Sequence, residues 1–223
     1  MDIFARPIAI RRTQAERSAL SDVRMVDAAI GLMASRGISG MTLKEVGELA
    51  GYSRAMAGWR FGTKANLCAF IIRTVGDEWL RALNEAVRNK HGLAAIHAAT
   101  DAHSRFVHDG AERIRVFYML WFHSTGPDPE LKQVIVKVHE RRQRDVEAWI
   151  EQGISAGAVR EDAEVKTVAA QFCATIIGIV YQWLVEPTAQ HQIHDLHQGL
   201  KQQMSRALAR DITDAKRPQQ EQE

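Results

Sequence analysis

Side chains of the types that bind nucleic acid are concentrated between residues 42 and 64. Arg54 carries a planar guanidinium that can donate two parallel hydrogen bonds to a guanine edge in the major groove. Ala55 and Met56 would face base edges in the same helical turn. The candidates for phosphate contacts are Thr42, Ser53, Trp59, Arg60 and Lys64, with Lys44 as a weaker one. The alternatives are that Arg54 is a solvated surface arginine and that Thr42 and Ser53 serve only as helix caps.

The first of these side chains also starts a short helix. Thr42 followed three residues later by Glu45 is a capping box, in which each side chain accepts a hydrogen bond from the other residue's backbone N–H. Gly51 suits the end of this helix, because only glycine enters the left-handed region of backbone conformation without steric cost. A short helix between residues 42 and 51 is therefore expected.

Two further helix starts follow directly. Ser53 is expected to cap a second short helix over residues 54–61, and Thr63 is expected to cap a third that opens with Lys64. Two short helices joined by a tight turn form a helix-turn-helix. The second helix of such a unit is narrow enough to enter the DNA major groove.

This segment resembles the N-terminal domain of the TetR family of bacterial transcriptional regulators. The resemblance covers roughly residues 20–70, and the residues that mark helix starts and turns occur at the fixed spacing of the family. They are residues 26–30, Gly37, Thr42, Ala50, Gly51, Ser53 and residues 61–67. The resemblance implies an all-helical homodimer, with an effector cavity in a larger second domain, whose occupancy moves the two DNA-binding heads out of register with the grooves.

Two positions depart from the family pattern. The family usually has Tyr at Gly58 and His or Tyr at Arg60. Glycine costs a helix about 1 kcal/mol relative to alanine, and it removes a phenolic phosphate contact. Trp59 and Arg60 can supply an indole N–H and a permanent charge in its place.

Composition and charge are those of an ordinary soluble globular protein, with 46% apolar and 25% charged residues among 223. The net charge of +2 is divided unevenly: residues 1–64 carry +4 and the rest of the chain −2. The basic part is the one with the helix-turn-helix, as attraction to phosphates requires. Cys68 and Cys173 have no metal-ligand spacing, and no apolar run reaches about 18 residues. We therefore expect a reduced, cytoplasmic protein without a signal sequence or membrane span.

The domain organisation follows from helical spacing, which recurs along the chain while strand alternation is absent. We expect a helix-turn-helix domain over residues 20–68 and a larger helical domain over 69–213. Residues 1–19 are interpreted as a flexible tail or as a basic arm for an adjacent minor groove, and residues 214–223 as a disordered tail. In the larger part, helices are expected at residues 63–90, 93–107, 113–123, 130–153, 165–184 and 193–211.

The first helix is expected to run from about Ser21 to before Gly37 and to build the small core that holds the second short helix rigid. One apolar face of this helix would pack against the two short helices. The residues of this core would be Val23, Val26, Ile30 and Met33 against Leu43, Val46, Leu49 and Phe61.

The helix expected at residues 165–184 is apolar over more of its circumference than one buried stripe requires. It is either central in its own domain or also in contact with a partner subunit. With the last helix it resembles the paired C-terminal helices through which the family dimerises, in a four-helix interface. The expected interface residues are Phe172, Ile176, Val180, Leu184, Leu196, Leu200 and Met204.

Aromatic residues gather in the middle of the larger domain and are candidates for a largely apolar effector pocket, with core packing as the alternative for each of them. They are Trp79, Phe106, Phe117, Tyr118, Trp121, Phe122, His123 and Trp149. Tyr118, His123 and Arg105 would orient a polar group of the effector.

Other functional classes have less support. His191, His194 and His197 repeat every three residues, which places at most two of them on one helical face. No phosphate loop or nucleophile elbow occurs, and we expect no metal, no cofactor and no catalytic residue. A solvated helix face is the expected setting of three arginines, Arg141, Arg142 and Arg144.

The sequence thus predicts a ligand-responsive transcriptional regulator, a repressor that binds a near-palindromic operator as a homodimer and is released by a small effector. An effector-independent architectural or cell-division protein on the same fold is one alternative. A helical enzyme that uses His123 as an acid–base group is another.

Overall fold

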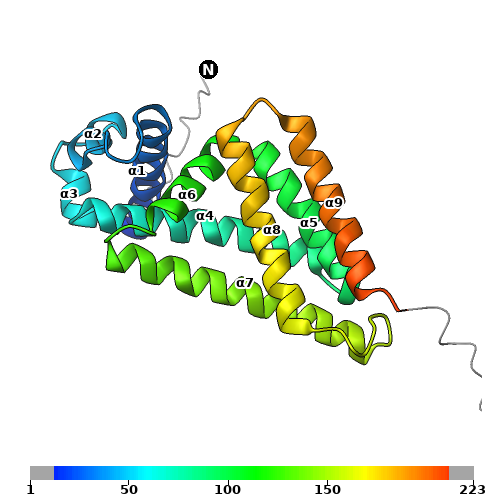
Figure 1. Ribbon diagram of the computed structural model, residues 1–223. Coiled ribbons are helices and arrows are strands. Elements are labelled where there is room, and N and C mark those ends of the chain that lie inside the picture. The colour runs from blue at the N-terminus through cyan, green and yellow to red at the C-terminus, as the bar shows by residue number, and fades with distance from the viewer. Residues whose placement is uncertain (1–12, 211–223) are drawn as a thin grey trace, which may run out of the picture. The chain divides into compact units, whose positions relative to one another are not determined.

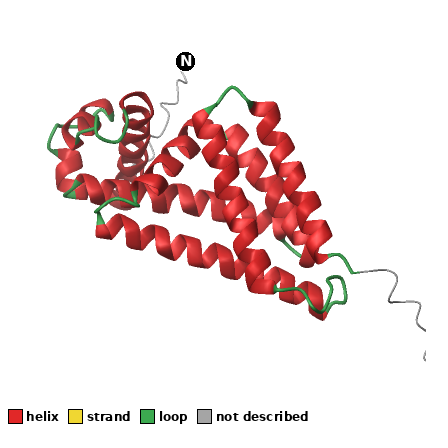
Figure 2. Ribbon diagram, viewed as in Figure 1, coloured by secondary structure: helices red, strands yellow, loops and turns green. Residues whose placement is uncertain are grey.

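The computed structural model describes residues 13–210, and within this range the chain is helical with no strand (Figure 2). The helices are labelled in Figure 1. They are α1 (Gln14–Arg36), α2 (Leu43–Leu49), α3 (Met56–Phe61), α4 (Lys64–Val87), α5 (Gly92–Asp109), α6 (Ala111–His123), α7 (Pro129–Ser155), α8 (Val165–Val185) and α9 (Gln190–Leu208). The all-helical fold class, with an N-terminal helix-turn-helix and a larger helical domain, is confirmed.

The chain divides into two compact units, with the boundary between Leu67 and Cys68, after the first turn of α4. The first unit contains α1, α2 and α3. The second contains the rest of α4 and the helices from α5 to α9.

α1 begins seven residues earlier than Ser21, the predicted start. Thr13 and Glu16 form a capping box: the N–H of Glu16 donates to Thr13 Oγ1 at 3.2 Å, and the N–H of Thr13 donates to Glu16 Oε2 at 2.7 Å. This satisfies two backbone donors that the first turn of a helix leaves without partners. The prediction of a tail over residues 1–19 is therefore wrong for residues 14–19, and residues 1–12 lie outside the described range.

Two residues of the predicted core of the first unit are exposed, and a third, Leu43, is only half-buried. Val26, Ile30 and Met33 of α1 are buried as expected, together with Val46 of α2 and Phe61 of α3. Met25 and Leu32, which were not predicted, are buried too, so the buried face of α1 lies further round the helix than expected.

The two exceptions are Val23, which is 54% exposed, and Leu49, which is 64% exposed. Val23 falls outside the rotated apolar face of α1. Leu49 is the last residue of α2 and lies on the side of that helix away from the core. The prediction that these two side chains are core residues is wrong.

The second unit is built around α5, which packs against α7 and α9, while α8 packs between α7 and α9 (Figure 1). By length and composition α8 is apolar enough to cross a membrane, with a mean hydropathy of 1.7 over its best window. In this fold 44% of the most apolar stretch of α8 is buried by protein. The apolarity of α8 is thus used, at least in part, inside its own unit.

Close backbone contact between α5 and α7 makes Gly153 a sensitive position. A Cβ atom on Gly153 would lie 2.6 Å from the Cα of Gly92 and 2.6 Å from Cγ2 of Val159. Gly92 has φ of +55°, in the left-handed region that favours glycine.

We expect Gly153→Ala to lower the free energy of unfolding by about 1–3 kcal/mol, because the added methyl overpacks the contact. Urea denaturation of the full chain measures this effect. Gly31→Ala is the matched control, since nothing lies within 4 Å of a Cβ there. It should be neutral or stabilising by up to about 1 kcal/mol. Equal stability of the two variants would show that the α5–α7 contact is not as tight as described.

Candidate DNA-binding and effector-binding sites

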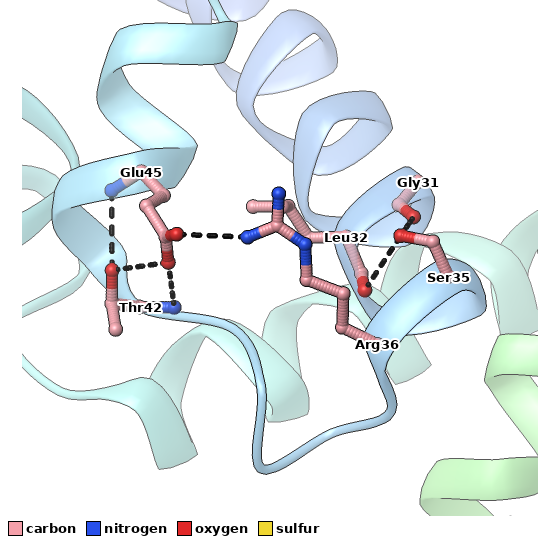
Figure 3. A network of polar contacts seen from close by, with 6 residues as sticks. All are labelled: Gly31, Leu32, Ser35, Arg36, Thr42 and Glu45. Carbon is pink, nitrogen blue, oxygen red and sulfur yellow. Dashed lines mark hydrogen bonds and ion pairs between the residues drawn. The ribbon is translucent and has the colours of Figure 1, made fainter.

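The start of α2 is tied to the end of α1 by a network of polar contacts (Figure 3). The hydroxyl of Thr42 donates to Glu45 Oε2 at 2.7 Å, and the backbone N–H of Glu45 donates to Thr42 Oγ1 at 3.3 Å. Arg36 at the end of α1 donates from Nη1 to Glu45 Oε1 at 3.0 Å. The hydrogen bond from Thr42, with Arg36 contributing, lowers the pKa of Glu45 below its ordinary value. The predicted capping box is confirmed, and it also anchors α2 to α1.

The turn between α2 and α3 depends on two glycines, of which only Gly51 was predicted. Gly51 has φ of +79°. Gly47, inside α2, lies so close to the turn that a Cβ atom would be 2.6 Å from the carbonyl oxygen of Ser53. The backbone N–H of Tyr52 donates to the carbonyl of Gly47 at 2.9 Å and closes the turn. A glycine in a helix interior is the sequence signal that would have identified this approach.

α3 begins at Met56 and not at Arg54, and Ser53 does not cap it. The backbone carbonyl of Ser53 accepts from the N–H of Met56 at 3.0 Å, and Ala55 occupies the cap position without a side-chain hydrogen bond. Residues 53–55 therefore form a turn before the helix. The hydroxyl of Ser53 is exposed and makes no cap, so the capping prediction is wrong there.

The other predicted cap is present. Thr63 Oγ1 accepts from the backbone N–H of Asn66 at 3.1 Å, and the first residue of α4 is Lys64. The side-chain amide of Asn66 donates to the carbonyl of Phe61 at 3.0 Å, which satisfies a carbonyl at the end of α3. The end of α3 and the start of α4 are thus joined by local hydrogen bonds.

Most side chains predicted to contact DNA lie at the surface of the first unit. Met56 and Lys64 are half-buried, and the exposed ones are Thr42, Lys44, Ser53, Arg54, Ala55, Trp59 and Arg60. Trp59 is 82% exposed, which is unusual for the largest amphipathic side chain. An exposed indole on a short helix is available to contact a ligand or a partner.

Three cations of this surface, Arg54, Arg60 and Lys64, have partners within the unit. The guanidinium of Arg60 donates from Nε and Nη2 to the two carboxylate oxygens of Asp22, both at 2.7 Å. Arg54 forms an ion pair with Glu48 of α2. Lys64 Nζ donates to the carbonyl of Ser39 at 3.2 Å. Contact with DNA would require each group to exchange or share its present partner.

A cavity of about 40 Å³ lies in the second unit, between α4, α5, α6, α7 and α8. Its apolar wall includes Trp79, Trp121, Trp149, Phe172 and Ile176. The polar side chains on its wall are His103, His139, Arg142 and Asp145. This volume accommodates a water molecule but is far below the roughly 300–1,000 Å³ of pockets that hold drug-sized ligands.

Three of the predicted pocket residues line this cavity, namely Trp79, Trp121 and Trp149. Phe106 and Phe117 pack behind them, with ring centroids 5.0 Å from Trp79 and 5.9 Å from Trp121, respectively.

The remaining predicted pocket residues lie elsewhere. Tyr118 is buried in the core, and Phe122 packs edge-on against Tyr181. His123 is exposed at the end of α6, and Arg105 lines a separate groove. The polar groups that do reach the cavity come from α5 and α7. The sequence predicts that Arg142 lies on a solvated helix face. This prediction is wrong, because Arg142 lies on the wall of the cavity.

A buried chain of hydrogen bonds leads from the cavity wall to α9. His197 Nδ1 lies 2.7 Å from the carbonyl of Ile193 and must donate to it, which leaves Nε2 as an acceptor. His103 Nδ1 then donates to His197 Nε2 at 2.9 Å, and His103 Nε2 accepts from the Tyr118 hydroxyl at 3.0 Å. Both rings are neutral in this arrangement. His197 is thus used internally, and no group of His, Cys, Asp and Glu within residues 13–210 is arranged to hold a metal.

The two histidines should make stability depend on pH. Burial, followed by the charges of His197 and Arg142, holds the pKa of His103 well below 6.5, and burial also lowers the pKa of His197. The unfolded chain therefore binds more protons than the folded one below about pH 6.5. Stability is fully present above that pH and is lost as the pH falls through it.

We expect the free energy of unfolding to fall by up to about 1.4 kcal/mol per histidine for each pH unit below 6.5. Urea denaturation at pH 7.5, 6.5 and 5.5 measures the slope. His103→Gln should flatten it, while His91→Gln, at an exposed position, should not. A wild-type chain equally stable at pH 7.5 and 5.5 would contradict the neutral buried pair.

The predicted interface residues lie mainly inside the second unit. Phe172, Ile176, Val180, Leu200 and Met204 are all buried. Leu184 and Leu196 are half-buried. The outward face of α8 instead carries Ala170, Ala174, Tyr181 and Val185, of which Tyr181 is 57% and Val185 66% exposed. Burial in the unit makes the largest apolar side chains of α8 inaccessible to a partner.

Comparison with known proteins places this arrangement in a family. Residues 25–69, which include α2 and α3, match the family described as bacterial regulatory proteins, tetR family. The helix-turn-helix-type transcriptional regulator CymR of Pseudomonas putida is 30% identical over 163 residues. This match covers 69% of the present chain and 75% of CymR.

Solved structures share the fold beyond the matched domain. The complex of SmeT with triclosan has a TM-score of 0.70 at 20% identity, over 86% of this chain and 93% of that one. SmeT is the repressor of a multidrug efflux pump of Stenotrophomonas maltophilia. A transcriptional regulator from Saccharomonospora viridis in complex with choline has a TM-score of 0.74 at 17% identity, over 89% of this chain and 100% of that one.

Proposed function

We propose a ligand-released repressor of transcription as the function of this chain, which belongs to the TetR family of bacterial regulatory proteins. Membership makes it a DNA-binding transcriptional regulator with a helix-turn-helix. The observation that carries the finer proposal is the combination of a rigidly anchored α2–α3 unit with a separate helical unit that encloses an aromatic cavity. DNA binding alone needs only the first of these.

The DNA-contacting surface is proposed to be formed by the turn before α3 and by α3 itself. Arg54 would read a base edge after releasing Glu48. Trp59 would contact the sugar–phosphate backbone, since its indole is exposed and offers an N–H donor. Arg60 would contribute less than its charge suggests, because Asp22 already accepts from two of its nitrogens.

The dimer interface is proposed on the outward faces of α8 and α9. On α8, Ala170, Ala174, Tyr181 and Val185 share one helical face, and small residues there permit close approach of a second helix. On α9, Gly199 is exposed, and a Cβ atom there would meet nothing within 4 Å. A two-fold pair of these helices makes a four-helix interface and presents two reading helices to successive half-sites of a near-palindrome.

Effector binding is proposed in the aromatic cavity of the second unit. The cavity is too small for a ligand as it stands, so binding must displace side chains or separate the helices that surround it. A ligand that binds only the expanded state shifts the population toward that state. Release from the operator would follow if the expanded state holds the two heads at another separation.

Selection of bound fragments from genomic DNA, followed by footprinting, tests the proposal. A repressor of this kind should protect one or a few near-palindromic sites in promoter regions, and a ligand should reduce protection. Protection of many unrelated sites would favour the effector-independent architectural alternative instead. We place the protein in the cytoplasm, where such sites are accessible.

A further inference from the structure

The chemical class of the effector can be inferred from Arg142, an inward-facing cation of α7. Its guanidinium carbon lies 5.2 Å from the ring centroid of Trp121, and 5.9 Å from each of the ring centroids of Trp79 and Phe117. These distances are in the range of cation–π attraction, which favours the charge but leaves the N–H groups without acceptors. The side chain is thus held in place by three rings while its donors stay available.

No hydrogen bond or ion pair joins Arg142 to any residue between positions 13 and 210. The half-buried Arg113 pairs with Glu78 at 2.8 Å, and Arg60 pairs with Asp22 at 2.7 Å. No buried side-chain nitrogen or oxygen atom in the described range lacks a partner. The nitrogens of Arg142, which have none, are therefore accessible from the cavity or from solvent. A guanidinium presented in this way is a preformed receptor for an anion.

We propose that the effector is a flat, largely apolar molecule with a single anionic group, such as an aromatic monocarboxylate, and that Arg142 binds that group through two parallel hydrogen bonds. This proposal rests on the proposed function and names the ligand class of the same site. The aromatic part would lie between Trp79, Trp121 and Trp149, where stacking on indoles is available.

Two other polar groups of the wall, His103 and Asp145, bear on the charge of the ligand. His103 has both ring nitrogens engaged, by Tyr118 and His197, so it offers no free donor to a ligand. Asp145 lies one helical turn after Arg142 and interacts with its charge, without a salt bridge between the two side chains in the described part of the chain. Its carboxylate would repel a dianion such as a phosphate more strongly than a monoanion, so it restricts the charge of the ligand.

A cationic ligand is disfavoured by the same geometry. The aromatic faces that would attract a ligand cation are already occupied by the guanidinium of Arg142, and two like charges would then share one site. A neutral ligand would fill the apolar part of the cavity but leave the donors of Arg142 without acceptors. The preference for an anion therefore comes from a group that no other ligand class satisfies.

The experiment uses the full-length chain and three probes of one shape, namely 2-naphthoate, 2-naphthamide and 2-naphthylmethylammonium. Tryptophan fluorescence and the thermal midpoint report binding, because Trp79, Trp121 and Trp149 line the cavity. We expect the carboxylate to bind at least about ten times more tightly than the amide, and the ammonium to bind most weakly. Naphthylphosphonate is a fourth probe, which tests whether the site prefers a ligand with a single negative charge. It should bind more weakly than the carboxylate.

Two variants locate the binding group. Arg142→Gln should weaken naphthoate binding about 10- to 100-fold, and Arg142→Lys should have a smaller effect because it keeps the charge but loses the planar fork. Arg144→Gln is the matched control on the same helix, since Arg144 is exposed and 4.0 Å from Glu140. It should leave naphthoate binding unchanged.

Three outcomes would overturn the proposal: equal binding of the carboxylate and the amide, an undiminished affinity in Arg142→Gln, or no binding of any probe. Operator binding by the unliganded wild-type chain is measured in parallel. If the chain binds its operator but none of the probes, the proposed anion site is wrong and the proposed function as a regulator is unaffected. If the chain does not bind DNA but binds naphthoate in a way that depends on Arg142, the proposed function is wrong and the proposed anion site is unaffected.

Discussion

Replacing Tyr181 and Val185 together by aspartate should convert the protein into a monomer and weaken operator binding by at least about 100-fold. Both side chains are exposed on the outward face of α8, at 57% and 66%. Two carboxylates there would meet two more across a two-fold axis, and like charges repel. Loss of the second head removes the effective-concentration gain of a linked pair, which is of order 10²–10⁴.

The matched control for this variant is Val136→Asp. Val136 is 44% exposed on α7, which is not one of the two helices of the proposed interface, so it receives the same chemical change on an exposed valine. Sedimentation equilibrium and fluorescence anisotropy with a labelled operator measure the two properties. A dimer of normal affinity in the double variant would exclude the α8 face from the interface.

Arg54→Ala should weaken operator binding by about 1–3 kcal/mol and relax the preference for one base, with dimerisation unchanged. The guanidinium lies in the turn before α3, exposed and paired with Glu48. Breaking that ion pair costs little, because exposed pairs are typically worth below about 1 kcal/mol. Exchange of the ion pair between Arg54 and Glu48 for hydrogen bonds from Arg54 to a guanine edge is therefore favourable.

Two further variants are measured beside Arg54→Ala, one as a control and one with the opposite expected effect. Arg88→Ala removes an exposed arginine that is also paired with a nearby carboxylate, in the second unit, and should leave operator affinity unchanged. Glu48→Gln frees Arg54 and removes a negative charge near the DNA, so it should tighten binding slightly. Salt-matched titrations in which Arg54→Ala binds as the wild type does would exclude the base contact.

Local patterns predicted the helix-turn-helix well because the forces involved act over a few residues. Thr42 and Glu45 form their capping box within one turn, and Gly51 adopts positive φ for reasons internal to its own backbone. The same signature at Thr13 and Glu16 was present in the sequence and would have placed the start of α1 correctly. The error at Ser53 arose because a turn and a first helical turn begin with the same residue types.

Tertiary features were predicted less well, since a residue type does not state which surface covers it. Phe172 and Val180 are apolar enough for either an interface or a core, and the fold uses them in the core. Arg142 and Arg144 are only two positions apart in the sequence, yet Arg142 lines the aromatic cavity and Arg144 is exposed. Nothing local distinguishes His103 from the exposed His91, because its partner His197 is 94 residues away.

The most direct measurement is the number of protomers bound to a duplex that carries either both half-sites or only one of them. Native mass spectrometry gives the stoichiometry, and anisotropy at low ionic strength gives the affinity. We expect two protomers on the complete site, and at least about 100-fold weaker binding when one half-site is scrambled. A single protomer bound with equal affinity to both duplexes, or no binding to either, would contradict it.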